Sequence, residues 1–547
     1  MGFARTFAAG LVGSTGYLVD VEADVSPGPP ATRLLGLADA WTSPTLDRVR
    51  AALANSGFGW PAQRVLINVS SPDNVRSGCS ADLSIATAIL AAVTQDPYQP
   101  LAIPSRSLAT TLLLGELGLD GSIRPVRGVL PMVLSADSRI NTVLVPEDNL
   151  SEATLAPDVK IVAVRSLNQV VKVLRGEFAA ARLRSEPGSM CRIWTGRRRG
   201  DESPSTAGTE PDLRDIAGQP LGRFALEVSA AGGHSLLLVG PAGSAKTMLA
   251  ERLAGLLPDL TAEQARDVAA IHSAAGLLSP ASGQYRRPPY MAPHHTATMA
   301  ALLGGGAGLR PGAVSLAHHG VLALLDAPEF LSVVLQSLRQ PSRDRQVNLA
   351  HDDVTVSMPA GGIRVLTAAP CPCATSERKA CGCSTLTRRA YQQRLNPLLP
   401  DIDITVHLKP ASGADMLTEP AARESSADVA ARVEAARRRS AKRLDSTPWR
   451  TNAEVPVSAL MGELRLSSAA VAPLLRALDA GDLSAAGLAA VQRLAWTLAD
   501  LAEIPEPTAK EAGLALSLRK GLDSATFTRG REEEGTDGRE QACMGSS

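Results

Sequence analysis

The chain has 547 residues, which exceeds the size of one hydrophobic core and predicts three or four domains. Its 55 basic and 55 acidic side chains cancel, so no overall field attracts nucleic acid, and any such contact must be local or arise from assembly. No apolar run approaches the roughly 18 residues of a membrane span, no signal peptide is evident, and the seven cysteines do not resemble a secreted disulfide framework. These features favour a cytoplasmic protein without a membrane partner.

Residues 1–175 alternate short β-rich runs with helical runs. YLVDVEADV, RVLINVS and TVLVPE have the composition of strands, while SPTLDRVRAALANSG and ADLSIATAILAAVTQ have helical periodicity. This alternation predicts a compact α/β domain. The apolar periodicity is then lost, and the Ser-, Gly-, Pro- and charge-rich segment that follows predicts a linker over residues 176–210.

A second α/β domain is predicted over residues 211–410, and it contains the apolar run SLLLV followed by GPAGSAKT. Helical periodicity predicts a helical domain over residues 411–522. The polar segment 523–547 has no core-forming pattern and is predicted to be a disordered tail.

GPAGSAKT has the pattern of a phosphate-binding loop, G-x-x-x-x-G-K-[ST], apart from Ala245, which stands where the pattern has glycine. Such a loop surrounds phosphates with backbone N–H groups, its lysine reaches the β and γ oxygens, and its hydroxyl binds Mg²⁺. A positive φ at Ala245 would cost about 1–2 kcal/mol. The alternative interpretation is a glycine-rich turn without a ligand. The residues expected to contact nucleotide are Gly240, Pro241, Ala242, Gly243, Ser244, Ala245, Lys246 and Thr247.

Further strings follow in a fixed order: AIHSAAGLL, APHHT, RPGAVSLAHHGVL, PCPCA and ESSADVAARVEAAR, with LLLGELGLDGSIRPVRGVLP in the N-terminal region. Together with the loop they resemble the magnesium-chelatase-like AAA+ proteins, and more narrowly the YifB/ComM branch. The resemblance covers about residues 1–512. It implies an α/β fold class with a Lon-protease-like α/β domain, a P-loop AAA+ α/β domain and a C-terminal helical domain.

The resemblance also implies a ring-forming protein, a hexamer in its homo-oligomeric form, that binds ATP and Mg²⁺ between subunits. Within the ComM branch it implies a translocase that drives DNA branch migration during recombination. The alternative is a catalytically inactive nucleotide-binding or structural partner of an active ring, which includes membership of a mixed ring. A true chelatase is not implied, because that enzyme needs partner subunits and tetrapyrrole chemistry that nothing in the sequence indicates.

The acidic strand end departs from the family pattern. The family reads G-V-L-F-L-D-E-L-P-E-F, with an Asp for Mg²⁺ and a Glu for the attacking water, and this chain reads GVLALLDAPEF. Without gaps, Leu325 replaces the Asp and Asp326 replaces the Glu. With a one-residue slip, Asp326 becomes the metal carboxylate and Ala327 replaces the Glu. Either match leaves one carboxylate at the strand end.

Two further positions depart from the same pattern. Ala369 matches the Asn that senses the γ-phosphate, and Asp401 matches the Arg that reaches the neighbouring subunit's site. Loss of such an arginine can cost about 10³–10⁵ in rate. These differences predict weak or absent hydrolysis. An active enzyme would use Lys246 and Thr247 on the phosphates and Mg²⁺, Asp326 as catalytic and metal carboxylate, and Arg493 from the lid.

Four cysteines form CPCATSERKACGC, in which two C-x-C pairs are separated by seven residues. Thiolates at this spacing could hold a structural Zn²⁺ in a tetrahedral knuckle, and the alternative is a loop with four reduced cysteines. The four candidate ligands are Cys371, Cys373, Cys381 and Cys383.

Three other features receive structural interpretations. The histidine pairs 294–295 and 318–319 are assigned to polar contacts or pore-facing loops, because adjacent side chains on a strand point in opposite directions. Ser80 lies near the nucleophile position of Lon-like proteases, but RGVLPMVLSAD offers no lysine to activate it, so proteolysis is not expected. The arginines between residues 432 and 443 are interpreted as a solvated helix face, with a DNA path in a ring as the alternative.

Overall fold

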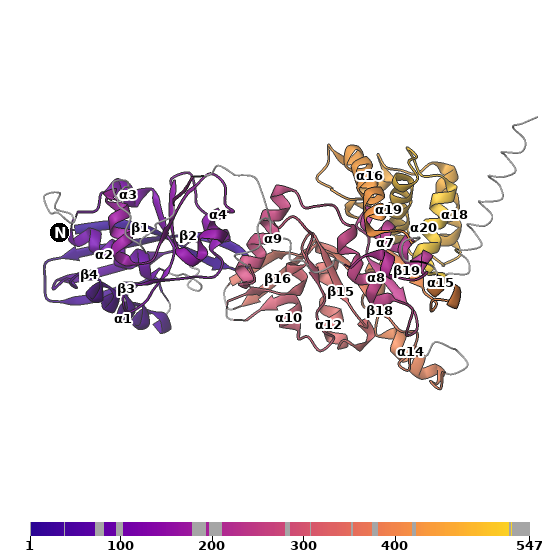
Figure 1. Cartoon of the computed structure of the whole chain (residues 1–547), viewed down its shortest axis with the longest axis horizontal. Coiled ribbons are helices and arrows are strands. Elements are labelled where there is room, and N and C mark those ends of the chain that lie inside the picture. Colours follow the sequence, from indigo (N-terminus) through magenta and orange to yellow (C-terminus); the bar gives the residue numbers. More distant parts are fainter. Residues whose placement is uncertain are drawn as a thin grey trace, which may run out of the picture.

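The computed structural model describes an elongated molecule in which the N-terminal residues form one body and the remainder forms a second, larger one (Figure 1). No helix among the described residues is both long and apolar enough to cross a bilayer. Ser80 and most of the predicted linker and tail lie outside the described residues. The described residues are 2–37, 39–71, 81–94, 102–177, 193–195, 211–278, 285–306, 308–351, 354–374, 381–417, 419, 423–523 and 527.

The N-terminal body is built on a mixed eight-stranded sheet in the order β10-β9-β8-β5-β1-β2-β4-β3. Side chains alternate between its two faces, so Ala8 of β1 packs in one core cluster while Phe7 and Ala9 pack in another. The strands are β1 (Gly2–Val12), β2 (Thr15–Ser26), β3 (Ala31–Leu35), β4 (Arg64–Ser70), β5 (Thr111–Leu113), β8 (Thr142–Pro146), β9 (Lys160–Val164) and β10 (Ile193–Thr195).

Helices cover this sheet on both faces. The helix α2 (Asp82–Val93) is buried around nearly its whole circumference, which explains its almost uniformly apolar sequence. The other elements of this body are α1 (Asp39–Asn55), α3 (Ser105–Ala109), β6 (Glu116–Leu117), β7 (Ile123–Arg124), α4 (Val129–Leu134), α5 (Leu150–Ala153) and α6 (Leu167–Leu174).

The predicted linker contains a strand that the sequence analysis missed. Residues of β10 pair antiparallel with β9, with Trp194 opposite Ile161, so this segment extends the N-terminal sheet. The signal was the short β-favouring run IWT, which is surrounded by polar residues and therefore carries no periodicity.

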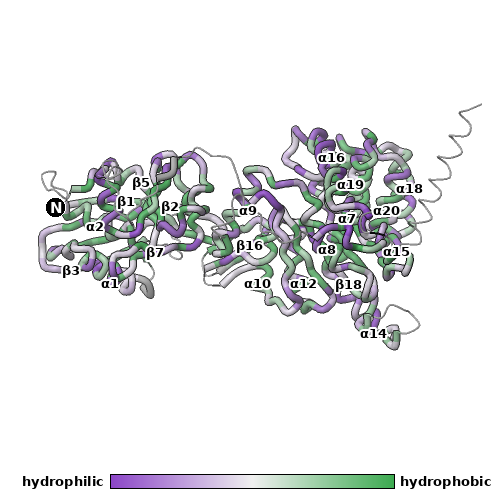
Figure 2. The backbone as a smooth tube through the Cα atoms, in the orientation of Figure 1, coloured by the Kyte–Doolittle hydropathy of each residue, from purple (hydrophilic) through white to green (hydrophobic). Residues whose placement is uncertain are grey.

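The C-terminal body is built on a parallel sheet in the order β12-β15-β18-β11-β19-β20. Both faces are covered, as expected for strands that are continuously apolar. Leu236 and Leu238 of β11 pack in one core cluster and Leu237 packs in another. The strands are β11 (Leu236–Val239), β12 (Tyr290–Met291), β15 (Val321–Leu324), β18 (Ile363–Ala368), β19 (Ile404–His407) and β20 (Leu522–Asp523). Figure 2 shows hydrophobic residues concentrated in the interior of both bodies.

Helices and two-stranded elements surround this sheet. The helix α14 protrudes from the body (Figure 1). The elements are α7 (Pro220–Gly232), α8 (Lys246–Arg252), α9 (Ala262–Ala275), α10 (Met299–Leu303), β13 (Gly304–Gly305), β14 (Arg310–Pro311), α11 (Ala313–Leu316), α12 (Ser332–Ser337), α13 (Arg339–Asp344), β16 (Gln346–His351), β17 (Val354–Pro359), α14 (Thr385–Gln393) and α15 (Gly413–Leu417).

The helical part packs on the parallel sheet, since Val433 and Leu494 belong to the same core cluster as Leu236. Its helices are α16 (Ser426–Leu444), α17 (Val457–Met461), α18 (Ser468–Asp479), α19 (Ala485–Leu501) and α20 (Ala509–Lys520).

The start of the predicted disordered tail is packed against the C-terminal body. Asp523 lies in β20, which pairs with β19, and Phe527 stacks on Phe224 with ring centroids 5.3 Å apart. Phe527 is only 9% exposed. The tail boundary predicted from the sequence is therefore too early, because a single aromatic in a polar segment gives no periodic signal.

Candidate nucleotide-binding site

The predicted phosphate loop lies between β11 and α8, at the carboxyl end of the strand and next to the point where the sheet order reverses. The N–H of Gly240 donates to the carbonyl of Ala368 at 3.0 Å, which ties the loop to β18. A Cβ at Gly240 would lie 2.5 Å from Ser244 Oγ, so close packing requires glycine there. Gly243 has a φ of +78°, and a Cβ there would have no atom within 4 Å, so glycine serves the backbone conformation.

Several backbone N–H groups of this loop have no protein acceptor in the part of the chain that the structure describes. They belong to Gly243, Ala245, Lys246 and Thr247. Gly243 and Thr247 are exposed, so the loop opens to solvent. Unpaired N–H groups at the start of a helix are the donors that bind phosphate in loops of this kind.

Lys246 extends back over the loop. Its Nζ donates to the carbonyls of Gly240 at 2.6 Å and Pro241 at 2.8 Å. Burial lowers the pKa of Lys246, and the charge of Asp326 partly opposes that shift. Asp326 therefore faces the ammonium closely enough to act on it, although the two residues lie 80 positions apart.

Ala245 adopts the left-handed conformation, with φ 57° and ψ 21°. The backbone of an alanine in this region costs about 1–2 kcal/mol, as the sequence analysis expected. Its side chain is partly buried and packs against the same core cluster as Leu249. The methyl group therefore faces the core.

The alternating side-chain directions along β15 distinguish the two possible matches of the acidic strand end to the family pattern. Val321 and Ala323 pack in the cluster that contains Leu249, and Leu325 packs against that same cluster. Asp326 is exposed, has a φ of +49°, and donates its N–H to Thr367 Oγ1 at 2.8 Å. Because Leu325 continues the face toward α8, this arrangement favours the match without a gap, in which leucine replaces the metal-binding Asp.

Tyr391 of α14 is a neighbour of this strand end that the sequence analysis missed. Burial raises the pKa of Tyr391, and so do the charge and the hydrogen bond of Glu329 and the charge of Asp326. The only signal was one aromatic in the polar helix TLTRRAYQQ. Glu329, which could not be placed from sequence, is exposed and pairs with this phenol.

Arg493 and Asp401 lie at the opposite edge of the sheet from Lys246. Both line a cavity of about 480 Å³ together with Ser235, which precedes β11, and Asp403, which precedes β19. The strands are parallel, so this edge is formed by their amino ends, whereas the phosphate loop follows a carboxyl end. Arg493 donates to the carbonyl of Val455 at 2.7 Å. Arg493, predicted to act from the lid, therefore lies at the other end of the strands from Lys246 of the same chain.

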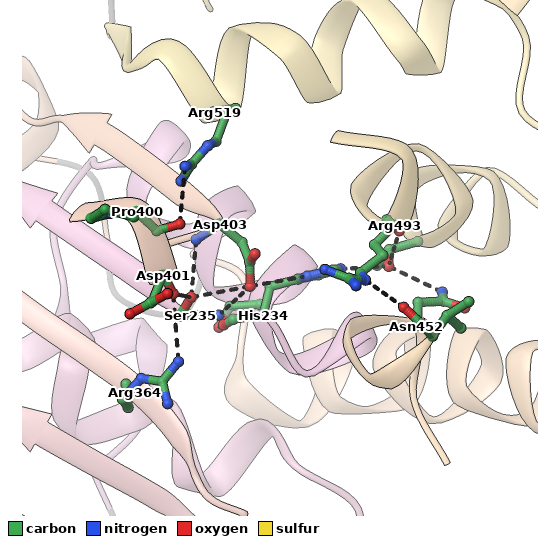
Figure 3. A network of polar contacts seen from close by, with 12 residues as sticks. His234, Ser235, Arg364, Pro400, Asp401, Asp403, Asn452, Arg493 and Arg519 are labelled. Carbon is green, nitrogen blue, oxygen red and sulfur yellow. Dashed lines mark hydrogen bonds and ion pairs between the residues drawn. The ribbon is translucent and has the colours of Figure 1, made fainter. Parts of the chain in front are cut away.

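This cavity, called the arginine cavity below, contains a network of polar contacts (Figure 3). Asp401 forms an ion pair with Arg343, with 3.2 Å between Oδ1 and Nε. Burial alone would raise the pKa of Asp403. The hydrogen bond and charge of His234 and the hydrogen bonds of Ser235 outweigh it and lower that pKa to about 2. The arginines that line the cavity are Arg343, Arg345, Arg364, Arg437, Arg450 and Arg493.

The arginines of α16 form a solvated face only in part, because Arg438 is exposed while four others are held by partners from other segments. Arg432 pairs with Glu227 and Glu424, and Arg437 donates to the carbonyl of Ala230. Arg439 donates to the carbonyl of Asp500, and Arg443 forms two bonds of 2.6 Å with the Asp500 carboxylate. Helical spacing could not reveal these partners, because they come from other segments of the chain.

The four cysteines of the two C-x-C pairs lie close together in the structure. Their Sγ atoms lie within 4.8 Å of one another, with Cys371 at 3.0 Å from Cys373 and 3.4 Å from Cys381. A tetrahedral zinc with bonds of about 2.3 Å places its sulfurs roughly 3.8 Å apart. Burial raises the pKa of the Cys371 thiol to about 12. The donor set therefore fits Zn²⁺, whose charge would stabilise the thiolate against this burial.

The second histidine pair does not point in opposite directions. His319 has a φ of +59°, which breaks the strand alternation and brings the rings of His318 and His319 to 3.8 Å. His318 Nδ1 accepts from the N–H of Gly361, so its other nitrogen carries the proton and is not a metal ligand in its neutral form. Burial lowers the pKa of His318 to about 3.

Comparison with known proteins assigns families to all three parts. Residues 212–416 match the family of magnesium chelatase subunit ChlI, residues 21–149 match a second ChlI family, and residues 423–519 match the ChlI C-terminal family. The chain is 43% identical to an uncharacterized protein of Mycobacterium tuberculosis H37Rv over 95% of this chain and 99% of the relative. A shorter match, 31% identical over 101 residues, is to an archaeal Lon protease of Pyrococcus abyssi and covers 18% of this chain and 9% of that protein.

Two named bacterial proteins place the chain within a branch. It is 35% identical to the uncharacterized protein YifB of Escherichia coli K12, over 80% of this chain and 82% of YifB. It is 34% identical to the competence protein ComM of Haemophilus influenzae, over 66% of this chain and 67% of ComM. The chain therefore belongs to the magnesium-chelatase-like AAA+ family, and within it to the YifB- and ComM-like proteins, and part of it is similar to an archaeal Lon protease.

Proposed function

We propose that this chain binds ATP and Mg²⁺ at the loop of residues 240–247 and works as a subunit of a cytoplasmic AAA+ ring. The observation that carries the proposal is the loop itself. Its N–H groups at Gly243, Ala245, Lys246 and Thr247 open to solvent beside a lysine that reaches across them. Membership of the family supports the use of ATP and Mg²⁺.

The ring is supported by where the other charged residues lie. Arg493 and Asp401 line the arginine cavity, on the far side of the sheet from Lys246 of the same chain. A side chain at that edge can act only on a nucleotide held by another copy. Family membership supports an oligomer, and we propose a hexamer.

The ring's work would be ATP-driven DNA remodelling of the kind that the resemblance to ComM implies. We propose weak hydrolysis, because Leu325, Ala369 and Asp401 replace the metal carboxylate, the γ-phosphate sensor and the interface arginine. Asp326 would be the one remaining carboxylate beside the phosphates, close enough to Lys246 to raise its pKa.

A second candidate is a nucleotide-binding partner that does not hydrolyse ATP itself. The ion pair between Arg343 and Asp401 favours it, because the interface position carries an acidic group that is already neutralised. In a mixed ring an active subunit would then supply the arginine and the glutamate at shared interfaces.

We also propose a structural Zn²⁺ at Cys371, Cys373, Cys381 and Cys383. The supporting observation is the convergence of four sulfurs from two C-x-C pairs within 4.8 Å.

Steady-state ATP hydrolysis with and without forked DNA separates the two candidates, with Lys246→Ala as the background. Activity above that background, stimulated by DNA, supports the translocase. Activity equal to the background in a protein that binds ATP supports the inactive partner.

A further inference from the structure

The phosphate loop is held at its tip by the segment that carries the cysteines. The N–H of Ala242 donates to the carbonyl of Ala374 at 3.1 Å, and Ala374 follows Cys373 directly. A second contact joins the same two segments at their base, where Gly240 donates to Ala368. The segment from β18 to the cysteines therefore contacts the loop at both its first residue and its tip.

The conformation of Ala374 depends on the turn made by the cysteines. Ala374 has a φ of +51°, an unfavourable conformation for alanine, and its N–H donates to the carbonyl of Cys371 at 3.0 Å. This turn aims the Ala374 carbonyl at the phosphate loop. Cys371 and Cys373 lie at its start and middle, and their sulfurs are 3.0 Å apart.

Among the described residues, few protein contacts hold this turn, one of them from Gln392 of α14 to the carbonyl of Pro370 at 3.3 Å. Cys371 is buried, but Cys373 is exposed, and Cys381 and Cys383 are half-buried. The helix that follows, α14, buries only Tyr391. A short exposed segment with so little apolar burial needs another source of order, and four thiolates on one ion supply it.

We propose that zinc bound by Cys371, Cys373, Cys381 and Cys383 fixes the Ala374 carbonyl against the Ala242 N–H and so preorganises the phosphate loop for nucleotide. The metal site then orders the phosphate loop of the ATP site as well as its own turn. This inference rests on the proposed ATP and zinc binding. Its physical basis is that ordering a loop before binding removes part of the entropy cost of binding.

The first test needs no nucleotide. Amide hydrogen exchange is measured on the full chain, as purified and after zinc removal by a chelator, with the metal content of each sample determined by mass spectrometry. The expected result is one zinc per chain before treatment and a rise of at least about tenfold in Ala242 exchange after it, with the amides of α19 unchanged. Zinc-free purified protein, or an Ala242 amide that exchanges equally in both samples, overturns the inference.

The second test uses a fluorescent ATP analogue with Mg²⁺ on the same two samples. Losing one backbone hydrogen bond at the loop tip predicts about three- to tenfold weaker binding without zinc. Equal affinity in two folded samples overturns the coupling. No binding to the zinc-loaded protein instead contradicts the proposed ATP site, and the exchange experiment still decides the coupling.

Two variants separate the hydrogen bond from the metal. Ala242→Pro removes the donor and leaves every cysteine in place, so it is expected to retain zinc but to bind the analogue as weakly as the zinc-free protein. Cys373→Ser/Cys381→Ser is expected to lose both zinc and affinity. Cys79→Ser, which removes a cysteine outside the cluster, is the matched control and is expected to change neither.

Discussion

Lys246 Nζ lies 2.6 Å from the carbonyl oxygen of Gly240, so the lysine that ends the phosphate loop is bonded to the residue that begins it. A second hydrogen bond, 2.8 Å long, joins the same Nζ to the carbonyl of Pro241. Phosphate oxygens must compete with these carbonyls for the ammonium. They have the advantage of charge, because ionic hydrogen bonds are roughly twice as strong as neutral ones.

Lys246→Ala is expected to weaken binding of a fluorescent ATP analogue by at least about 30-fold. The reason is the loss of the one lysine that reaches across the loop, together with its charge-assisted bonds to phosphate. Fluorescence titration of both proteins measures the change. Lys442→Ala, which removes an exposed lysine of α16, is the matched control, and equal weakening in both variants would show only a general charge effect.

The pH dependence of binding follows from the pKa of Lys246. Burial lowers this pKa below its usual 10.5, and only the cationic form attracts phosphate. Affinity is therefore expected to fall as pH rises, and to begin falling below pH 10.5. Asp326→Asn removes the charge that opposes the shift, so the fall should move to lower pH in magnesium-free buffer. An unmoved profile would mean that Asp326 does not face the lysine.

Ala245→Gly is expected to change ATP affinity by less than about threefold. The methyl group packs against the core, so its removal opens no space for phosphate. Relief of about 1–2 kcal/mol of backbone strain is offset by about 0.8 kcal/mol of lost burial and about 0.4–1 kcal/mol of added unfolded-state entropy, so the melting temperature should hardly move. A gain in affinity of tenfold or more would show that the methyl does obstruct the phosphates. Ala431→Gly, at an exposed position of α16, is the control for affinity.

The Asp500 carboxylate is expected to be important for the stability of the helical part. It is 3% exposed in its side chain and receives both terminal nitrogens of Arg443, whose guanidinium also lies 4.5 Å from the centre of the Trp496 ring. Asp500→Ala leaves a partly buried arginine without its carboxylate, with only the bond to Asn452 remaining, and should cost about 3–5 kcal/mol. Thermal unfolding followed by tryptophan fluorescence measures the loss. Arg438→Ala, at an exposed position of the same helix, should cost less than about 0.5 kcal/mol.

Exchanging the charges of Arg343 and Asp401 is expected to restore an interface arginine. Asp401→Arg alone would place like charges beside Arg343, whereas Arg343→Asp/Asp401→Arg keeps the pair of opposite charges. In the proposed ring the double variant should hydrolyse ATP at least about tenfold faster than the native chain, because an interface arginine stabilises the transferring phosphoryl group. Hydrolysis no faster than in the native chain would mean that position 401 does not reach a neighbour's nucleotide.

The phosphate loop and the order of the domains could be predicted from the sequence because the signals for them lie within short stretches of the chain. A strand, a glycine-containing loop and a helix follow one another within about 20 residues, and buried parallel strands are continuously apolar. The family strings then extended the prediction to the Lon-like domain and the helical part, which the comparisons confirm.

The arginine cavity could not be predicted in the same way. Its residues lie between positions 233 and 493, and only the sheet topology brings Ser235, Asp401 and Arg493 to one edge. The directions of the His319 and Ala245 side chains could not be predicted either. Both residues have positive φ values, which turn the side chain away from the direction that strand or loop spacing suggests. The partners of the α16 arginines, such as Glu227 and Asp500, are equally distant in sequence.

Equilibrium binding of a fluorescent ATP analogue in the presence of Mg²⁺ decides whether the loop of residues 240–247 holds nucleotide. The open N–H groups beside Lys246, and the core-facing methyl of Ala245, predict saturable binding in the micromolar range that Lys246→Ala weakens by at least about 30-fold. No binding up to millimolar concentrations, in a protein whose thermal unfolding shows it to be folded, would contradict the account and leave GPAGSAKT as a loop without a ligand.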